Sequence, residues 1–380
     1  METPHDVWVL AGQSNMEGCG LLCEALPPDE RVWSFTTAGH WEVAREPLHR
    51  FWESFTSVHV DLLRAALPEV ADKTNEEMAL AEIAVRPHGA GLGLSFGMAV
   101  ADATGKPVGL IPAAHGGTSL GQWSQELAPM GGGSLYGGML ERVRRAGGKV
   151  RGLLWYQGES DCSPADARTY AARFDAWIAA ARRDLGEPDL PVAVVQLGRW
   201  IWPGDEPTDE AWDIVREALA DLPNRVPNAV VVSAIDLPLA DGIHISATGL
   251  VRLGRRLAQA IAPMAGVPGG RRTPSVTAIE TGTATNGLGT VTLRCADVQG
   301  GWRDEQPLYG FEVRVNGAPM GIVGAEVRGD GGSDIRLTLE AAISGPVTVA
   351  YALGTMPVAT VVDRGDMPLC AFRARAATPA

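Results

Sequence analysis

Five short runs of almost uninterrupted apolar residues constrain the fold of this 380-residue chain more than any other feature. Helical patterns fill the sequence between most of these runs. Strands that alternate with helices and carry apolar residues on both faces are typical of a parallel sheet covered by helices. The five runs are residues 7–10, 108–111, 152–155, 192–197 and 230–235.

Helix signals support this alternation. Ser163 is placed to cap a helix that extends to about residue 185, and Pro164 stands at its first position. Ser246 is placed to begin a last helix that ends near residue 261. Five strands with intervening helices predict a flavodoxin-like, three-layer α/β sandwich with a five-stranded parallel sheet. In such a fold, sites form beyond the carboxyl ends of the strands.

Two stretches interrupt the alternation. Residues from about 17 to 93 form a long insertion after the first strand. After Pro263 the segment AGVPGGRRTP is typical of a linker, and beyond it apolar and polar residues alternate between glycine-rich turns. That period-two pattern is typical of antiparallel β structure. We therefore expect an α/β domain over residues 1–265 and a C-terminal β-sandwich domain over residues 273–380.

Charge and composition disfavour several classes of partner. The formal net charge is −13, which argues against nucleic acid and anionic membrane surfaces because both reward clustered Lys and Arg. No apolar run approaches the roughly 18–20 residues of a membrane span. The first residues contain no leader-like segment, so a cytoplasmic location is expected, with a secreted or periplasmic mature form as the alternative. Five cysteines without CxxC spacing indicate neither a zinc site nor a disulfide framework.

The first expected strand leads into the sequence AGQSNMEG. Gly12 permits a sharp turn, and Ser14 then lies at a strand end where a helix could begin. In that position the hydroxyl is exposed, and the Ser14 N–H points toward a developing oxyanion. Serine is common in turns that contain glycine, so this motif alone is weak evidence for a nucleophile.

A second motif, LADGIHISATG, follows the fifth expected strand. Asp241 and His244 are three residues apart, which lets the carboxylate accept a hydrogen bond from the histidine Nδ1–H. The Nε2 atom is then free to take a proton from a serine. The motif lies at the same edge of the predicted sheet as Ser14. This placement, more than the spacing, favours a Ser–His–Asp arrangement.

Two further motifs follow the second and third expected strands. They are HGGTS at residues 115–119 and YQGESD at residues 156–161. Adjacent glycines can present backbone N–H groups to a carbonyl oxygen, and Gln157 offers an amide donor for the same task. Either motif alone could be an ordinary turn between a strand and a helix.

Together the four motifs resemble those of the SGNH-hydrolase superfamily, specifically its sialate O-acetylesterase-like and acetylxylan-esterase-like carbohydrate esterases. GQSNM, GGTS followed by Trp123, WYQGES and DGIH occur in the family's order over about residues 7–262. The C-terminal segment is similar, more loosely, to the β domain that closes sialate O-acetylesterases. The insertion at residues 17–93 matches no part of the family pattern.

The resemblance implies a carboxylic-ester hydrolase that removes O-acetyl groups from carbohydrates, most similar to sialate O-acetylesterases. It implies a catalytic triad of Ser14, Asp241 and His244, with no metal and no organic cofactor. The N–H groups of Ser14 and Gly117 and the side chain of Gln157 would form the oxyanion hole. Acetylxylan or another polysaccharide is the alternative substrate. An inactive sugar-binding protein on an esterase scaffold is the alternative from another class.

Several other residues have candidate roles near this site. Glu159 is an alternative acid partner for His244, although the three-residue spacing favours Asp241. Otherwise Glu159 supports its loop or a substrate hydroxyl. Tryptophan rings in loops can stack on sugar faces. The candidate substrate contacts are Gln13, His115, Trp41 and Trp202.

Overall fold

The computed structural model describes residues 4–67, 73–74, 76–78, 88–204 and 207–376 of the chain. Its centre is a seven-stranded sheet in the order β4-β3-β6-β1-β7-β8-β9. Neighbouring strands are parallel except at one edge, where β4 is antiparallel to β3. The strands are β1 (Asp6–Gly12), β3 (Val32–Phe35), β4 (Trp41–Val43), β6 (Val108–Pro112), β7 (Lys149–Tyr156), β8 (Val192–Gln196) and β9 (Ala229–Ser233).

The α/β prediction is confirmed, and the order β6-β1-β7-β8-β9 is that of a flavodoxin-like sheet. The predicted number of five strands is wrong, because β3 and β4 from the insertion extend the sheet beyond β6. These two strands are only four and three residues long, and they contain polar residues such as Ser34 and Glu42. They therefore lack the continuous apolar run by which the other strands were predicted. A separate small pairing joins β2 (Gly20–Leu21) to β5 (His88–Ala90).

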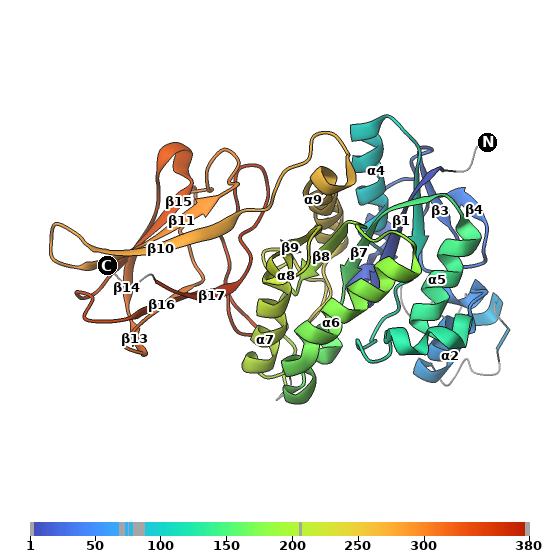
Figure 1. Cartoon of the computed structure of the whole chain (residues 1–380), viewed down its shortest axis with the longest axis horizontal. Helices are drawn as coiled ribbons and strands as arrows, with labels where there is room; N and C mark the ends of the chain where they lie inside the picture. Colours follow the sequence, from blue (N-terminus) through green and yellow to red (C-terminus); the bar gives the residue numbers. More distant parts are fainter. Residues whose placement is uncertain (1–3, 68–72, 75, 79–87, 205–206, 377–380) are drawn as a thin grey trace.

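Helices cover both faces of the large sheet (Figure 1). The pair α4 and α9 packs together on one face, and α5, α6 and α7 lie on the other. As predicted, Ser163 caps α6 by accepting a hydrogen bond from the Asp166 N–H at 3.1 Å.

The longer helices are α2 (Ser57–Ala66), α4 (Gly93–Thr104), α5 (Leu135–Ala146), α6 (Pro164–Asp184), α7 (Asp209–Ala220) and α9 (Ala247–Ala265). The short ones are α1 (Ser14–Glu17), α8 (Leu222–Arg225), η1 (Leu22–Glu24), η2 (Phe51–Glu53), η4 (Gln125–Gly133), η5 (Glu159–Asp161) and η6 (Asp330–Gly332). Among the described residues, no helix is both long and apolar enough to cross a bilayer.

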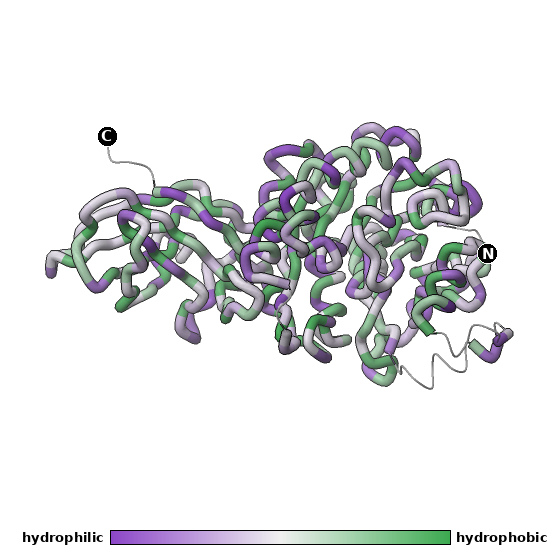
Figure 2. The backbone as a smooth tube through the Cα atoms, turned by 90° about the horizontal axis from the view of Figure 1, so that it is seen from below, coloured by the Kyte–Doolittle hydropathy of each residue, from purple (hydrophilic) through white to green (hydrophobic). Residues whose placement is uncertain are grey.

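The C-terminal region forms two four-stranded antiparallel sheets at one end of the elongated molecule (Figure 1, Figure 2). Their orders are β10-β11-β15-β14 and β13-β12-β16-β17. Apolar side chains from both sheets pack into their own core around the buried Trp302. The antiparallel β region is thus confirmed, while the domain boundaries at residues 265 and 273 stay predictions. The strands are β10 (Ser275–Thr283), β11 (Gly289–Ala296), β12 (Phe311–Val315), β13 (Ala318–Met320), β14 (Ile322–Arg328), β15 (Asp334–Leu339), β16 (Val347–Tyr351) and β17 (Phe372–Arg375).

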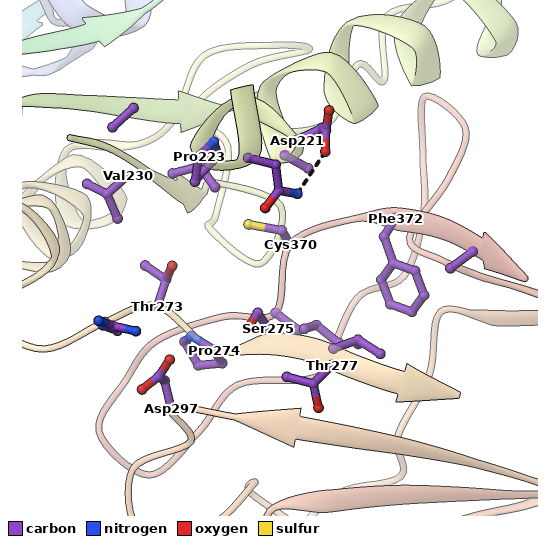
Figure 3. A pocket seen from close by; sticks show the side chains of 18 of the residues that line it. Asp221, Pro223, Val230, Thr273, Pro274, Ser275, Thr277, Asp297, Cys370 and Phe372 are labelled. Carbon is purple, nitrogen blue, oxygen red and sulfur yellow. Dashed lines mark hydrogen bonds between the residues drawn. The ribbon is translucent and has the colours of Figure 1, made fainter. Parts of the chain in front are cut away.

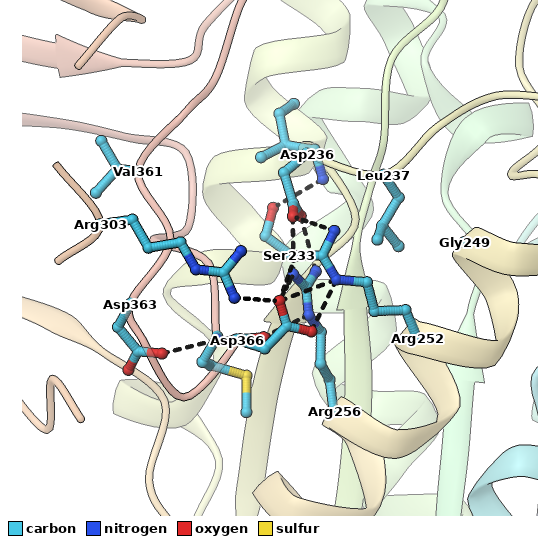
Figure 4. Close-up of polar contacts among 12 residues, drawn as sticks. Ser233, Asp236, Leu237, Gly249, Arg252, Arg256, Arg303, Val361, Asp363 and Asp366 are labelled. Carbon is cyan, nitrogen blue, oxygen red and sulfur yellow. Dashed lines mark hydrogen bonds and ion pairs between the residues drawn. The ribbon is translucent and has the colours of Figure 1, made fainter. Parts of the chain in front are cut away.

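Ion pairs anchor this β region on the α/β part (Figure 4). The Asp366 carboxylate accepts hydrogen bonds from Arg252 and Arg256 of α9 and from Arg303. Burial would raise the pKa of Asp366, but the hydrogen bond from Arg252 and the charges of Arg256 and Arg252 outweigh it. They lower the pKa to about 2. Arg256 also donates two hydrogen bonds of 2.8 Å to Asp236. The β region is thereby tied to the segment that follows β9.

A hollow of about 1120 Å³ lies between the β region and the α/β part. Figure 3 shows Pro223 and Val230 on one side of it and Pro274, Thr277 and Phe372 on the other. Val230 lies at the start of β9, whereas sites in doubly wound folds form at the carboxyl ends of the strands. This hollow therefore lies at the amino ends of the strands, whereas sites of this fold class lie at the carboxyl ends.

Candidate active site

Ser14 lies directly beyond the carboxyl end of β1, at the first position of α1. Gly12 makes the turn that places it there. Its φ is +133°, and a Cβ at this position would lie 2.2 Å from the Tyr156 carbonyl oxygen of the neighbouring strand β7. Only glycine fits such a close approach at a positive φ. The strand order reverses between β1 and β7, where doubly wound sheets form their sites.

The structure brings Ser14, His244 and Asp241 into one chain of hydrogen bonds. The His244 Nε2 atom is 3.0 Å from the Ser14 Oγ atom, and its Nδ1 atom is 2.7 Å from Asp241 Oδ2. An Nδ1–H that donates to the carboxylate leaves the Nε2 lone pair facing the serine hydroxyl. These three groups are therefore arranged for a proton to pass from Ser14 to His244.

Asp241 is held in place by its own loop. Its Oδ1 atom accepts the backbone N–H groups of His244 at 2.7 Å and Ile243 at 2.8 Å. Partial burial would raise the pKa of Asp241, but these hydrogen bonds and the one from the His244 side chain outweigh it and lower the pKa. Asp241 is consequently a carboxylate at neutral pH, and it can stabilise the positive charge that forms when His244 takes a proton.

Two backbone N–H groups are available beside the Ser14 hydroxyl. The first N–H groups of a helix have no partner within it, and Ser14 begins α1. Within the described part of the chain, neither the Ser14 N–H nor the Gly117 N–H donates a hydrogen bond. The loop that carries Gly117 is fixed by Gly116, whose N–H donates to Glu17 Oε2 at 2.6 Å. A Cβ on Gly116 would lie 3.5 Å from Ser14 Cβ, so this loop passes directly beside the serine.

Gln157 does not fit its predicted role as an oxyanion donor. Its side chain is fully buried, and its Nε2 atom donates to Thr118 O at 3.1 Å and to Asp161 Oδ2 at 2.5 Å. The Oε1 atom accepts the Tyr170 hydroxyl at 3.2 Å. Both amide hydrogens are thus used inside the protein, and none is left for a substrate oxygen. The position corrects the prediction: Gln157 holds the loop that ends at Thr118, next to Gly117.

Replacing Gln157 by alanine should consequently lower both stability and turnover. Thr118 O, Asp161 and the Tyr170 hydroxyl would lose a buried partner, which costs about 1–3 kcal/mol per unsatisfied group. The loop beside Ser14 would shift, and kcat should fall about 10–10²-fold. Thermal unfolding and steady-state kinetics measure the two effects, with the exposed Gln306→Ala as control. A large loss of kcat at unchanged stability would instead restore the donor role.

Glu159, the alternative acid, makes no hydrogen bond to His244 in the described structure. Its Oε1 atom accepts the Asn15 side-chain amide at 3.0 Å, and its Oε2 atom is buried without a partner. Burial raises the pKa of Glu159. In this geometry His244 is paired with Asp241, and Glu159 is connected to the His244 loop through Asn15.

Comparisons with known proteins identify the family of this chain. Residues 4–263 match the model of a family described as carbohydrate esterase, sialic acid-specific acetylesterase. The chain belongs to this family. It is a carboxylic-ester hydrolase.

Relatives of this esterase share both sequence and fold. A protein of Arabidopsis thaliana, described as a probable carbohydrate esterase, is 31% identical over 283 residues, which are 68% of this chain and 90% of the relative. Its crystal structure matches with a TM-score of 0.52 over 68% of this chain and 98% of that one. A carbohydrate acetylesterase from Xanthomonas citri is 22% identical, with a TM-score of 0.68 over 97% of this chain and 80% of that one. The fold likeness to the Xanthomonas enzyme therefore includes the C-terminal β sheets.

Two of the predicted substrate contacts are buried next to the site of this esterase. Gln13 is 3% exposed, and its Oε1 atom accepts the Ser160 N–H at 3.4 Å. His115 is 6% exposed, and its Nδ1 atom lies 3.0 Å from the His59 Nδ1 atom. Burial lowers the pKa of His115 to about 3, so the imidazole is neutral at physiological pH. His115 therefore supports the loop beside Ser14 as an uncharged group.

The two predicted tryptophan contacts differ in position. Trp41 lies on the edge strand β4, and its Nε1–H donates to Ala146 O at 3.1 Å. Its ring packs close to Gly109, near the start of β6, and the strands β3 and β6 separate β4 from β1, the strand that leads to Ser14. A substrate contact of Trp41 therefore stays a prediction. Trp202 is 45% exposed, and its ring centre lies 6.1 Å from that of His244. Trp202 borders the site.

Two residues of the GQSNME motif contact the site although the sequence did not predict it. Asn15 contacts the loop around His244, and Glu17 holds Gly116. Both stand within three residues of Ser14, which was the available signal. Within the described ranges, no group of three His, Cys, Asp or Glu side chains is arranged to hold a metal ion.

Proposed function

We propose that Ser14, His244 and Asp241 carry the hydrolysis in this carbohydrate acetylesterase, and that acetylated sialic acid is its substrate. The observation that carries the proposal is the continuous hydrogen-bonded chain from the Ser14 Oγ atom through His244 to the Asp241 carboxylate. A sugar-binding protein on an inactive scaffold would have no need of this arrangement, so a hydrolytic role is favoured over the binding role.

The proposed reaction transfers the acetyl group in two steps. His244 Nε2 takes the proton of Ser14 while Oγ attacks the acetyl carbonyl carbon. The resulting oxyanion accepts hydrogen bonds from the Ser14 and Gly117 N–H groups. The bond to the sugar oxygen then breaks, and that oxygen leaves with the proton from His244. Water, deprotonated by His244, next attacks the acetyl-serine ester and releases acetate and the free Ser14 hydroxyl.

Charge changes during this reaction explain the roles of the surrounding groups. The imidazole becomes positively charged when it takes the proton, and the Asp241 carboxylate at 2.7 Å stabilises that charge. The negative charge forms on the former carbonyl oxygen, where preorganised N–H donors stabilise the transition state. Removing one such donor typically costs about 10²–10³-fold in kcat.

Support for a sugar substrate comes from the family and from Trp202. Gly242 has no side chain, and a Cβ there would lie 1.8 Å from the Trp202 ring, so the indole lies directly against the loop of Asp241 and His244. The Ile201 N–H donates to Gly242 O at 2.7 Å and fixes this contact. The exposed part of the ring presents an apolar, aromatic surface beside the nucleophile, which suits the C–H face of a sugar.

Trp202→Ala should weaken the binding of acetylated sugars without affecting a small ester. Loss of about 1–2 kcal/mol of apolar contact raises KM for the sugar ester about 5–30-fold. The kcat on p-nitrophenyl acetate should be unchanged, because this ester has no sugar ring. Val323→Ala, an exposed apolar residue of β14, is the control. Equal losses on both esters would indicate that Trp202 only supports the His244 loop.

The substrate proposal is tested by comparing kcat/KM across acetylated sugars. The panel contains O-acetylated sialic acid, acetylated xylan oligomers and monoacetylated glucose, with p-nitrophenyl acetate as the reference ester. We expect the highest kcat/KM on the sialic acid ester. A higher value on acetylxylan would assign the second candidate substrate. Binding of these sugars without turnover of any ester would favour the inactive sugar-binding protein.

A further inference from the structure

One buried side chain, that of Asn15, contacts the backbone on both sides of His244. Its Oδ1 atom accepts the Ile245 N–H at 2.9 Å, and its Nδ2 atom lies 3.4 Å from the Ile243 carbonyl oxygen. Asn15 is 1% exposed and stands 230 residues from Ile245 in the sequence. The amide thus bridges the two peptide groups that flank the histidine, and it does so from the residue next to Ser14.

Glu159 determines which way this amide points. The Nδ2–H of Asn15 donates to Glu159 Oε1 at 3.0 Å, so the other end of the amide, Oδ1, must face Ile245. Glu159 comes from η5, after β7, and is itself buried. Residues that follow β1, β7 and β9 are thereby joined through one side chain.

The contact with Asn15 fixes a part of the His244 loop that the hydrogen bonds of Asp241 within the loop do not fix. Asp241 holds His244 from the N-terminal side of the loop, and its side chain is 41% exposed. Asn15 holds the C-terminal side from within the protein. A displacement of a reacting group by about 1 Å can lower the rate 10²-fold. The contact with Asn15 therefore matters for the distance between His244 Nε2 and Ser14 Oγ.

We propose that Asn15, oriented by Glu159, is a positioning residue that sets the place of His244 relative to Ser14. The inference rests on the proposed role of His244 as the base for Ser14. It assigns to Glu159 a different role from that of an acid partner: its carboxylate acts as an acceptor for Asn15, and an uncharged acceptor in the same place serves equally well.

An exchange of donor and acceptor tests this proposal. Asn15→Asp keeps an oxygen for the Ile245 N–H but sets a second buried carboxylate against Glu159, and the two repel. The kcat on p-nitrophenyl acetate should fall about 10–10²-fold with little change in KM. Glu159→Gln alone keeps an acceptor for Asn15 and should stay within about threefold of the original kcat. The double variant Asn15→Asp/Glu159→Gln reverses donor and acceptor between these two residues, and it should recover a part of the loss, because the contact with Ile243 O is not restored.

A spectroscopic measurement separates positioning from a general loss of structure. The proton between His244 Nδ1 and Asp241 gives a downfield ¹H NMR signal, which should weaken or shift in Asn15→Asp and return in the double variant. If Asn15→Asp does not fold, Asn15→Ala replaces it and should show the same loss of kcat and of this signal. Full activity of the folded Asn15 variants, or a double variant no better than Asn15→Asp, would overturn the proposal.

Ser14→Ala in the same assay distinguishes this inference from the proposed function. An inactive Ser14→Ala protein together with fully active Asn15 variants would refute the positioning role alone. A fully active Ser14→Ala protein would refute the proposed mechanism, and the positioning role would fall with it.

Discussion

Ser14→Ala is expected to lower kcat on p-nitrophenyl acetate by about 10³-fold or more, and His244→Ala should do the same. Without the Ser14 Oγ atom no acetyl-enzyme can form. Without His244 Nε2, which lies 3.0 Å from that oxygen, nothing removes the hydroxyl proton. Stopped and continuous assays of p-nitrophenol release measure both losses.

The two losses should not add. Nucleophile and base act as one unit, so the double variant Ser14→Ala/His244→Ala should be about as slow as either single variant. The exposed His40 supplies a matched control, because His40→Ala removes an imidazole from the insertion and should retain full kcat. A folded Ser14→Ala protein with undiminished activity would remove Ser14 from the mechanism.

Asp241→Asn is expected to have the largest effect of any isosteric change, a loss of about 10⁴-fold in kcat by analogy with serine proteases. Asparagine keeps an oxygen for the N–H groups of His244 and Ile243, so the loop should stay folded. Its amide, however, donates to Nδ1 and forces the proton onto Nε2. That tautomer cannot accept the proton of Ser14.

Glu159→Gln is the matched change on the second carboxylate near the site. It should cost at most about threefold, because a glutamine oxygen still accepts the Asn15 amide, and the hydrogen bond of His244 Nδ1 is to Asp241. Side-by-side kcat values of the two variants rank the carboxylates. If Glu159→Gln proved the more damaging of the two, the acid role would pass to Glu159.

The central sheet was predictable because its strands are buried on both faces. A strand of this kind must be apolar at nearly every position, and residues 7–10 and 192–197 show this plainly. The strands β3 and β4 are short and stand at an edge, where Glu42 can be tolerated, so no such run marks them. The strand β3 is placed by its pairing with β6, a contact between residues far apart in sequence, and β4 joins the sheet by pairing with β3.

Local spacing explains which parts of the site were predictable. Asp241 and His244 contact each other across three residues, so their pairing is visible in the sequence itself. The sequence indicated that the Gln157 amide can donate a hydrogen bond. It did not indicate that acceptors within the protein use this amide, because Thr118 O comes from a different loop. Asn15 escaped notice for the same reason: its partners stand 144 and 230 residues away. Side chains that link distant loops are seen only once the fold is known.

The most direct test of the account is the capture of the acetyl group on the enzyme. The protein is mixed with p-nitrophenyl acetate, quenched in acid during turnover, digested and measured by mass spectrometry. We predict one added acetyl group on the peptide that contains Ser14, and none in the Ser14→Ala protein. An acetyl group on another residue, or steady turnover by Ser14→Ala, would contradict the account.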